Sequence, residues 1–281
     1  VGRRETLSEL VVPIRVDGRT LAALNVESDR LAAFGERDRE RLELFAEAAA
    51  RETIRLAPTR IALYNYAHVP WMKPHQKALG RIGLPGPAEK AEIQGIVAEA
   101  LVRAGWIPIG MDHFARPEDG LARALANGTL TRGFMGYTTG RGLDLAAFGS
   151  SGISAMGSTY AQASKDLAAW RAAVREGRSA VDRGFLLGPE DLLRRDLILD
   201  LFCNFRVDLA AISSAHGADA QGIVAADLER LAPMADDGLV EIRGGVVLIT
   251  PAGRPFVRNV CMAFDRYLES DPGDRRYSST L

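Results

Sequence analysis

The stretch G-M-D-H-F-A-R-P-E-D-G-L-A-R-A, residues 110–124, places polar side chains between an apolar segment and a helical pattern. The residues that lead into it, W-I-P-I-G at 106–110, are an apolar run typical of a buried strand. Pro117 is followed by two acidic residues, as in the first turn of a helix. The loop between strand and helix carries three polar residues: Asp112, His113 and Arg116. Ligands bind at this sheet edge in α/β folds, so we interpret the three as candidate substrate-binding residues.

An alternative interpretation gives the same three residues structural roles. Asp112 would cap the helix, His113 would pack into the interior, and Arg116 would lie on the surface. Sequence position alone does not decide between the two interpretations.

A strand and a helix are also predicted before this stretch. I-A-L-Y-N-Y-A-H at 61–68 is typical of a strand, and residues 87–104 carry apolar side chains at helical spacing. The resulting order, β-α-β-α, predicts parallel strands joined by right-handed crossovers. We therefore predict an α/β fold with parallel strands. The Gly-, Ser- and Thr-rich residues 125–165 are predicted to pass close to a ligand.

Composition and charge narrow the class of protein. Two cysteines in 281 residues cannot form a disulfide framework, which favours a reducing cytoplasm. No run of about 18 apolar residues is present, so we expect no membrane span. The polar N-terminus predicts no secretory signal peptide. Residues 58–189 hold 15 basic and 10 acidic side chains, a net charge of +5, which suits an anionic small molecule. A solvated surface without a ligand is the alternative.

The N-terminal segment predicts a hairpin followed by a helix. Residues 9–16 and 19–28 are typical of two strands, although Pro13 limits the first to an edge or a bulge. The helix is predicted from Asp38 to about Leu56. Residues 1–57 resemble the last two strands and closing helix of a GAF domain. The strands and loops of the GAF ligand pocket are missing, so this resemblance implies a role in homodimerisation rather than in ligand sensing.

The C-terminal third predicts helices followed by a two-stranded wing. Helices are expected at 190–203 and 222–232, a tight hairpin at 236–250, and a last helix that Thr250 caps. This order indicates a winged-helix-like domain. Residues 190–281 hold 10 basic and 15 acidic side chains, a net charge of −5, which argues against nucleic-acid binding. We interpret the region as a packing domain.

From about Ile54 onwards the chain resembles the C-terminal half of the oxygen-independent coproporphyrinogen III oxidases. The resemblance rests on short motifs that follow one another in the order of that family. They are Y-N-Y-A-H-V-P (64–70), G-M-D-H-F-A-R-P (110–117), G-Y-T-T (136–139), G-I-S-A-M-G (152–157), Y-A-Q (160–162), L-F-C-N-F-R-V-D (201–208), D-G-L-V (237–240) and V-R-N-V-C-M-A-F-D-R-Y-L (257–268).

The resemblance implies radical S-adenosylmethionine chemistry in haem biosynthesis. The family binds a [4Fe-4S] cluster through three cysteines in a C-x-x-x-C-x-x-C loop, which this sequence does not contain. Cys203 and Cys261 are predicted to be buried packing residues. The resemblance also implies that Ala67 and Met156 contact S-adenosyl-L-methionine. Arg116 becomes a candidate partner for a carboxylate of coproporphyrinogen, since arginine binds carboxylates bidentately.

These observations predict three segments: a GAF-like fragment at 1–57, a partial radical SAM barrel with ligand loops at 58–189, and a C-terminal helical, winged-helix-like domain at 190–281. We predict a homologue of the oxidase that lacks the cluster-binding half and is inactive alone. The alternatives are a GAF-associated interaction module and a recombined, non-functional fragment. A metal site formed by His68, His75 and His113 is disfavoured, because no H-x-x-x-H helix or carboxylate partner supports it.

Overall fold

The computed structural model describes residues 8–16, 19–28, 48, 50–63, 68–71, 73–77 and 87–268. The chain divides into two compact units, with the boundary between Asp119 and Gly120. This boundary differs from the predicted ones at 57–58 and 189–190, and the three-segment division stays a prediction. No helix among the described residues is both long enough and apolar enough to cross a membrane.

The predicted N-terminal hairpin is present. Strand β1 (Ser8–Val16) pairs antiparallel with β2 (Arg19–Ser28), and the register shifts between Ile14 and Arg15, next to Pro13. Residues 50–56 are helical, which agrees with the end of the predicted helix at Leu56. The predicted start of that helix at Asp38 lies outside the described residues.

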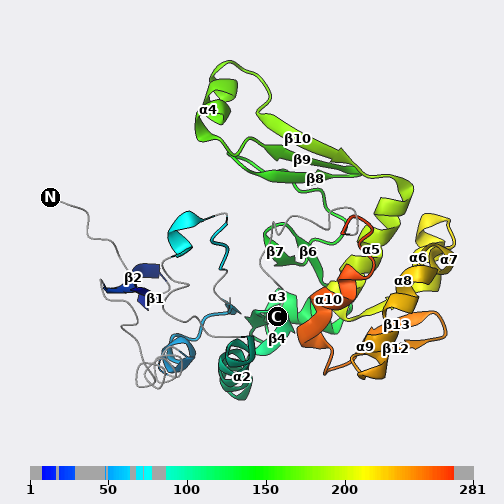
Figure 1. Ribbon diagram of the computed structural model, residues 1–281, viewed down its shortest axis with the longest axis horizontal. Coiled ribbons are helices and arrows are strands. Elements are labelled where there is room, and N and C mark those ends of the chain that lie inside the picture. Colours follow the sequence, from blue (N-terminus) through cyan, green and yellow to red (C-terminus); the bar gives the residue numbers. More distant parts are fainter. Residues whose placement is uncertain are drawn as a thin grey trace. The chain divides into compact units, whose positions relative to one another are not determined.

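A three-stranded sheet forms the centre of the first unit, in the order β3-β5-β4. Its strands are β3 (Arg60–Ala62), β4 (Ile107–Gly110) and β5 (His113–Ala115), and β5 is antiparallel to both neighbours. Strands β3 and β4 therefore run parallel, as predicted, and the unpredicted strand β5 lies between them. Helix α2 (Pro87–Arg103) connects β3 to β4, as predicted (Figure 1).

The predicted loop at 111–116 is largely a strand. Gly110 pairs with His113, so the chain reverses through Met111 and Asp112, and Met111 adopts a positive φ of 47°. No glycine or asparagine marks this turn, which is why sequence reasoning extended the loop to the next helix. That helix, α3 (Gly120–Ala126), begins three residues after Pro117.

The core of the first unit lies where α2 packs on this sheet. Leu101, Trp106 and Phe114 are at most 5% exposed. Six partly buried residues pack around them: Ile54, Ile61, Leu63, Val97, Ala98 and Ala104. The apolar side chains of α2 and of the predicted strand at 106–110 therefore pack into one hydrophobic cluster.

Antiparallel strands replace much of the predicted glycine-rich loop in the second unit. Strand β6 (Thr131–Gly133) pairs with β7 (Gly136–Thr138), while β8 (Ile153–Met156), β9 (Thr159–Ala163) and β10 (Val181–Leu186) form a sheet in the order β10-β9-β8 (Figure 1). Helix α4 (Leu167–Arg175) connects β9 to β10, and the Asp166 side chain caps it.

Helix α5 (Pro189–Asn204) is the central element of the second unit and confirms the helix predicted at 190–203. Pro189 occupies its first turn, where the missing N–H costs nothing. Leu193, Leu197 and Leu201 follow one another at four-residue spacing and are at most 1% exposed. This spacing fixes the buried stripe of the helix.

The C-terminal segment combines short helices with a three-stranded antiparallel sheet in the order β11-β13-β12. Its elements are β11 (Arg206–Asp208), α6 (Leu209–His216), α7 (Ala220–Ile223), α8 (Ala225–Arg230), α9 (Ala232–Asp236), β12 (Val240–Arg243), β13 (Val246–Ile249), a 3-10 helix (Arg254–Phe256) and α10 (Val257–Met262).

Two helices predicted in this segment need correction. The single helix expected at 222–232 is three short ones, and Pro233 at the start of α9 cannot continue a preceding helix because it lacks an N–H. The last helix starts at Val257 rather than at Pro251. Thr250 does cap a turn, since its Oγ1 accepts a hydrogen bond from the N–H of Gly253 at 3.1 Å.

Candidate functional site

Asp112 and His113 form a hydrogen-bonded pair at the β4–β5 turn. His113 Nδ1 lies 2.6 Å from Asp112 Oδ1, and the two side chains are 17% and 15% exposed. The carbonyl of Asp112 accepts a hydrogen bond from the N–H of Leu63 at 2.7 Å, which ties the turn to the chain beyond β3. The carboxylate fixes the orientation of the imidazole, as in many sites that bind or transfer protons.

Arg116 lies on the face of the sheet opposite to His113. Its backbone N–H donates to Thr59 O at 2.9 Å, so strand pairing continues past β5. Side chains alternate along a strand, so His113 and Arg116 lie on opposite faces. The guanidinium stacks on Trp106, and Nη1 donates to Ala104 O at 3.1 Å. The structure thus brings Asp112 and His113 together but turns Arg116 towards the core.

The structure describes only one of the two residues that are predicted to contact S-adenosylmethionine. Ala67 lies outside the described residues. Met156 is the last residue of β8, and its side chain is half-exposed. The next residue is tightly held, because Gly157 N–H donates to Asp144 Oδ1 at 2.8 Å and Gly157 O accepts from Arg195 Nη1 at 3.1 Å. Met156 therefore presents a half-exposed apolar side chain at the tip of the β8–β9 hairpin.

The two cysteines do not fit an iron–sulfur cluster. Both are buried, Cys203 in α5 and Cys261 in α10. Burial raises the pKa of the Cys203 thiol to about 12 and raises the pKa of Cys261 as well. Cluster ligands are thiolates, which these surroundings disfavour. Among the described residues no group of three or more His, Cys, Asp or Glu side chains is arranged to hold a metal ion.

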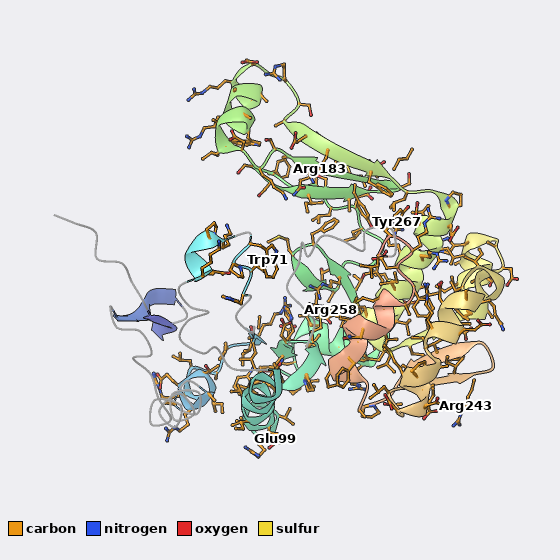
Figure 2. All side chains as sticks on the ribbon, viewed as in Figure 1. Trp71, Glu99, Arg183, Arg243, Arg258 and Tyr267 are labelled. Atoms are coloured by element: carbon orange, nitrogen blue, oxygen red, sulfur yellow. The ribbon has the colours of Figure 1, made fainter. Side chains whose placement is uncertain are left out.

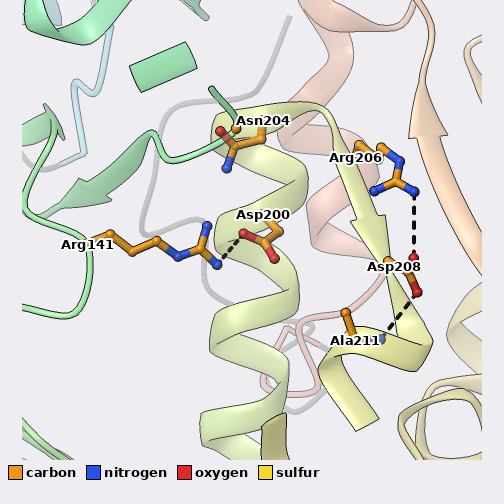
Figure 3. Close-up of a pocket in the computed structure, with 7 residues that line it drawn as sticks. Arg141, Asp200, Asn204, Arg206, Asp208 and Ala211 are labelled. Atoms are coloured by element: carbon orange, nitrogen blue, oxygen red, sulfur yellow. Dashed lines mark hydrogen bonds and ion pairs between the residues drawn. The ribbon is translucent and has the colours of Figure 1, made fainter. Parts of the chain in front are cut away.

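A polar hollow at the C-terminal end of α5 was missed from the sequence. It has a volume of about 240 Å³ and brings two arginines and two aspartates together with an asparagine (Figure 3). Arg141 pairs with Asp200 at 2.6 Å, and Arg206 with Asp208 at 3.6 Å. The signal was present in L-F-C-N-F-R-V-D, since Asn204 lies one helical turn after Asp200 and two charged residues follow it.

The fold and the motifs define an α/β protein of the radical S-adenosylmethionine type. A structure of coproporphyrinogen III oxidase (HemN) from Escherichia coli, described as a radical SAM enzyme, matches with a TM-score of 0.77 and 39% identity over 80% of this chain and 52% of that one. Residues 187–256 match the family described as the HemN C-terminal domain.

Two curated relatives are oxygen-independent coproporphyrinogen III oxidases. The protein from Escherichia coli (strain K12) is 40% identical over 226 residues, covering 80% of this chain and 50% of the relative. The protein from Thermostichus vulcanus is 40% identical over 236 residues, covering 84% and 72%. The chain belongs to the oxygen-independent coproporphyrinogen III oxidase family. It spans about half the length of the Escherichia coli relative.

Proposed function

We propose that this chain is the substrate-side part of an oxygen-independent coproporphyrinogen III oxidase, which converts coproporphyrinogen III to protoporphyrinogen IX by oxidative decarboxylation. The observation that carries the proposal is 40% identity over 236 residues to the Thermostichus vulcanus relative, of which the chain covers 72%. The net charge of +5 in residues 58–189 supports an anionic substrate such as a porphyrinogen.

Different site residues would bind the substrate and the cofactor. Asp112 orients His113, which would hydrogen-bond a propionate of the porphyrinogen. Arg116 has five N–H donors and uses one for Ala104 O, so the others would pair with a second carboxylate. Ala67 and Met156 would contact S-adenosyl-L-methionine, as the family resemblance implies.

Radical initiation would depend on a separate cluster-bearing part of the barrel. The sequence has no C-x-x-x-C-x-x-C loop, and its two thiols are buried with raised pKa values. We expect the chain to be inactive alone and to remain in the cytoplasm with its substrate. Anaerobic reconstitution with iron and sulfide should leave less than one iron per chain. Four irons per chain, together with cleavage of S-adenosylmethionine on reduction, would contradict this part of the proposal.

Binding of coproporphyrinogen III tests the substrate assignment directly. Calorimetric titration under anaerobic conditions should show saturable binding to the full chain. We expect His113→Ala and Arg116→Ala each to weaken it about tenfold, the value of one charge-assisted hydrogen bond. Arg103→Ala is the matched control, because Arg103 pairs with Glu99 on the outer surface of α2 (Figure 2). No binding to the unmodified chain would end the proposal, and unchanged affinity in Arg116→Ala would remove that residue from it.

A second candidate function concerns the N-terminal segment. The hairpin β1–β2 is formed, and it lies outside residues 187–256, which match the HemN C-terminal domain. We propose that residues 1–57, the GAF-like fragment, mediate homodimerisation, and that the C-terminal sheet with its helices is a winged-helix-like packing domain. Light scattering should show a dimer for the full chain and a monomer after deletion of residues 1–57. An unchanged mass would contradict dimerisation through this segment.

A further inference from the structure

The hollow at the C-terminal end of α5 has the features of a small-molecule site that the proposed function does not use. It lies entirely within the second unit and has a volume of about 240 Å³. Helix α5, strand β11 and helix α6 contribute residues, together with the connections after α3 and β7 (Figure 3). The residues that line it are Gly128, Arg141, Asp200, Asn204, Arg206, Asp208 and Ala211.

Asn204 brings an unused hydrogen-bond acceptor to this hollow. Its Nδ2 donates to Leu130 O at 3.1 Å, which fixes the orientation of the amide. Its Oδ1 is shielded from bulk water and accepts no hydrogen bond from any described residue. Buried acceptors are nearly always satisfied, and a donor that reached Oδ1 from the hollow would satisfy this one.

The charges of the hollow are balanced in two ion pairs. Asp200 is paired with Arg141 at 2.6 Å, and its side chain remains 20% exposed. Burial raises the pKa of Asp200, and a cation placed beside it would relieve this. The C-terminal end of α5 adds the negative pole of a helix of 16 residues. This side of the hollow favours a positively charged group.

Arg206 supplies the opposite charge. Its nearest carboxylate oxygen, on Asp208, is 3.6 Å away, which is beyond a good hydrogen bond. The other oxygen of Asp208 is already engaged, because it accepts from the N–H groups of Ala210 and Ala211 and so caps α6. Arg206 is 54% exposed and retains N–H donors that suit a carboxylate.

We propose that this hollow binds a small zwitterion of the α-amino acid class. The ammonium group lies against Asp200 and Asn204, and the carboxylate pairs with Arg206. A site of no net charge that presents both signs matches a neutral ligand that carries both signs. A hollow of about 240 Å³ has room for a small amino acid such as serine together with several water molecules. This inference goes beyond the proposed function and does not depend on it.

The test uses three compounds that differ by one charged group. L-Serine carries both charges, ethanolamine lacks the carboxylate, and 3-hydroxypropanoate lacks the ammonium. Saturation-transfer NMR with the full chain should give a dissociation constant for L-serine of about 1 mM or lower, and values at least tenfold higher for the other two. Equal binding of a singly charged compound, or no saturable binding of L-serine up to tens of millimolar, would overturn the proposal and leave a water-filled hollow.

A pair of matched variants identifies the site. Arg206→Gln should weaken L-serine binding at least tenfold, and Asp200→Asn should weaken it similarly. Arg243→Gln is the control, because Arg243 also pairs with a carboxylate two residues away, Glu241, at the same distance of 3.6 Å (Figure 2). It should leave binding unchanged. Unaltered affinity in both Arg206→Gln and Asp200→Asn would overturn the assignment, and thermal unfolding of each variant checks that it is folded.

Discussion

The guanidinium carbon of Arg116 lies 4.1 Å from the centre of the Trp106 ring, while Nη1 donates to the carbonyl of Ala104 just beyond the end of α2. Trp106 in turn donates from Nε1 to Pro58 O at 3.1 Å. A residue of the family motif therefore joins the end of a helix to the core of the first unit. A substrate role for Arg116 would use the donors that this structural role leaves.

Substituting Arg116 should destabilise the first unit. Arg116→Ala removes a cation–π contact and the donor to a carbonyl near the helix end, so we expect a loss of about 1–3 kcal/mol in the free energy of unfolding. Arg116→Lys should lose less, because an ammonium group keeps the attraction to the ring. Urea unfolding followed by tryptophan fluorescence measures both. Arg103→Ala removes an exposed ion pair and should change stability by less than about 0.5 kcal/mol; an equal effect in both alanine variants would contradict the structural role.

The thiols of Cys203 and Cys261 should be inert in the folded protein. With a pKa of about 12, only about one Cys203 in ten thousand is a thiolate at pH 8. Cys261 is 5% exposed, and burial raises its pKa too. Ellman's reagent should therefore modify neither residue within an hour at pH 8, and both after unfolding in guanidinium chloride. Rapid reaction of the native protein would show that these helices open, and would reopen the question of cluster ligation.

Asp191 should make stability depend on pH in the acidic range. Burial opposes ionisation of this carboxyl, but the Gly188 N–H at 2.9 Å, the Tyr267 hydroxyl at 2.8 Å and the charge of Arg266 together hold its pKa below the usual value. A carboxyl with a lowered folded-state pKa stabilises the fold above its unfolded pKa of about 3.9, and this contribution is lost as the pH falls through the folded value.

The difference in unfolding free energy between the wild type and Asp191→Asn should therefore be constant above about pH 5 and shrink below about pH 4. Tyr267→Phe removes one donor and should reduce the pH dependence in part. Urea titrations between about pH 2.5 and about pH 7, which cover the acid transition and the plateau above it, provide the measurement. A difference that does not vary with pH would show that Asp191 contributes through packing alone.

The sequence predicted those helices and strands whose residue pattern is contained in one continuous segment. Helix α5 with its leucine stripe is of this kind, because burial selects side chains at a fixed period, and so is the hairpin of β1 and β2, which the D-G turn at 17–18 and the apolar runs on either side signal. Strand β5 was missed because its turn places Met111, a residue with a β-carbon, at a positive φ, and the turn lacks the Asn-Gly or Asp-Gly pair that signals a tight hairpin. Helical spacing predicted one helix at 222–232 and a last helix from Pro251, so it missed the division into α7, α8 and α9 and the start of α10 at Val257.

The candidate site was predictable only in part. The contact of Asp112 with His113 follows from their adjacency in a tight turn, whereas the burial of Arg116 against Trp106 depends on which face of β5 meets the core. The hollow beside Asn204 depends on segments more than 60 residues apart, from Arg141 to Asp208. Spacing along the chain carries no information on such distant partners, so the structure was needed to find it.

Replacing glycine by alanine is expected to change stability in opposite directions at two positions of the chain. A β-carbon on Gly253 would lie 2.0 Å from Leu239 O, and that carbonyl cannot easily retreat because it accepts hydrogen bonds from Thr250. Gly253→Ala should therefore destabilise the protein by about 2 kcal/mol or more. Gly95 lies within α2 with nothing inside 4 Å of the added carbon, so Gly95→Ala should stabilise that helix by up to about 1 kcal/mol. Thermal unfolding and amide exchange of the two units measure both changes. A tolerated alanine at Gly253 would show that the turn between β13 and α10 is looser than these contacts imply.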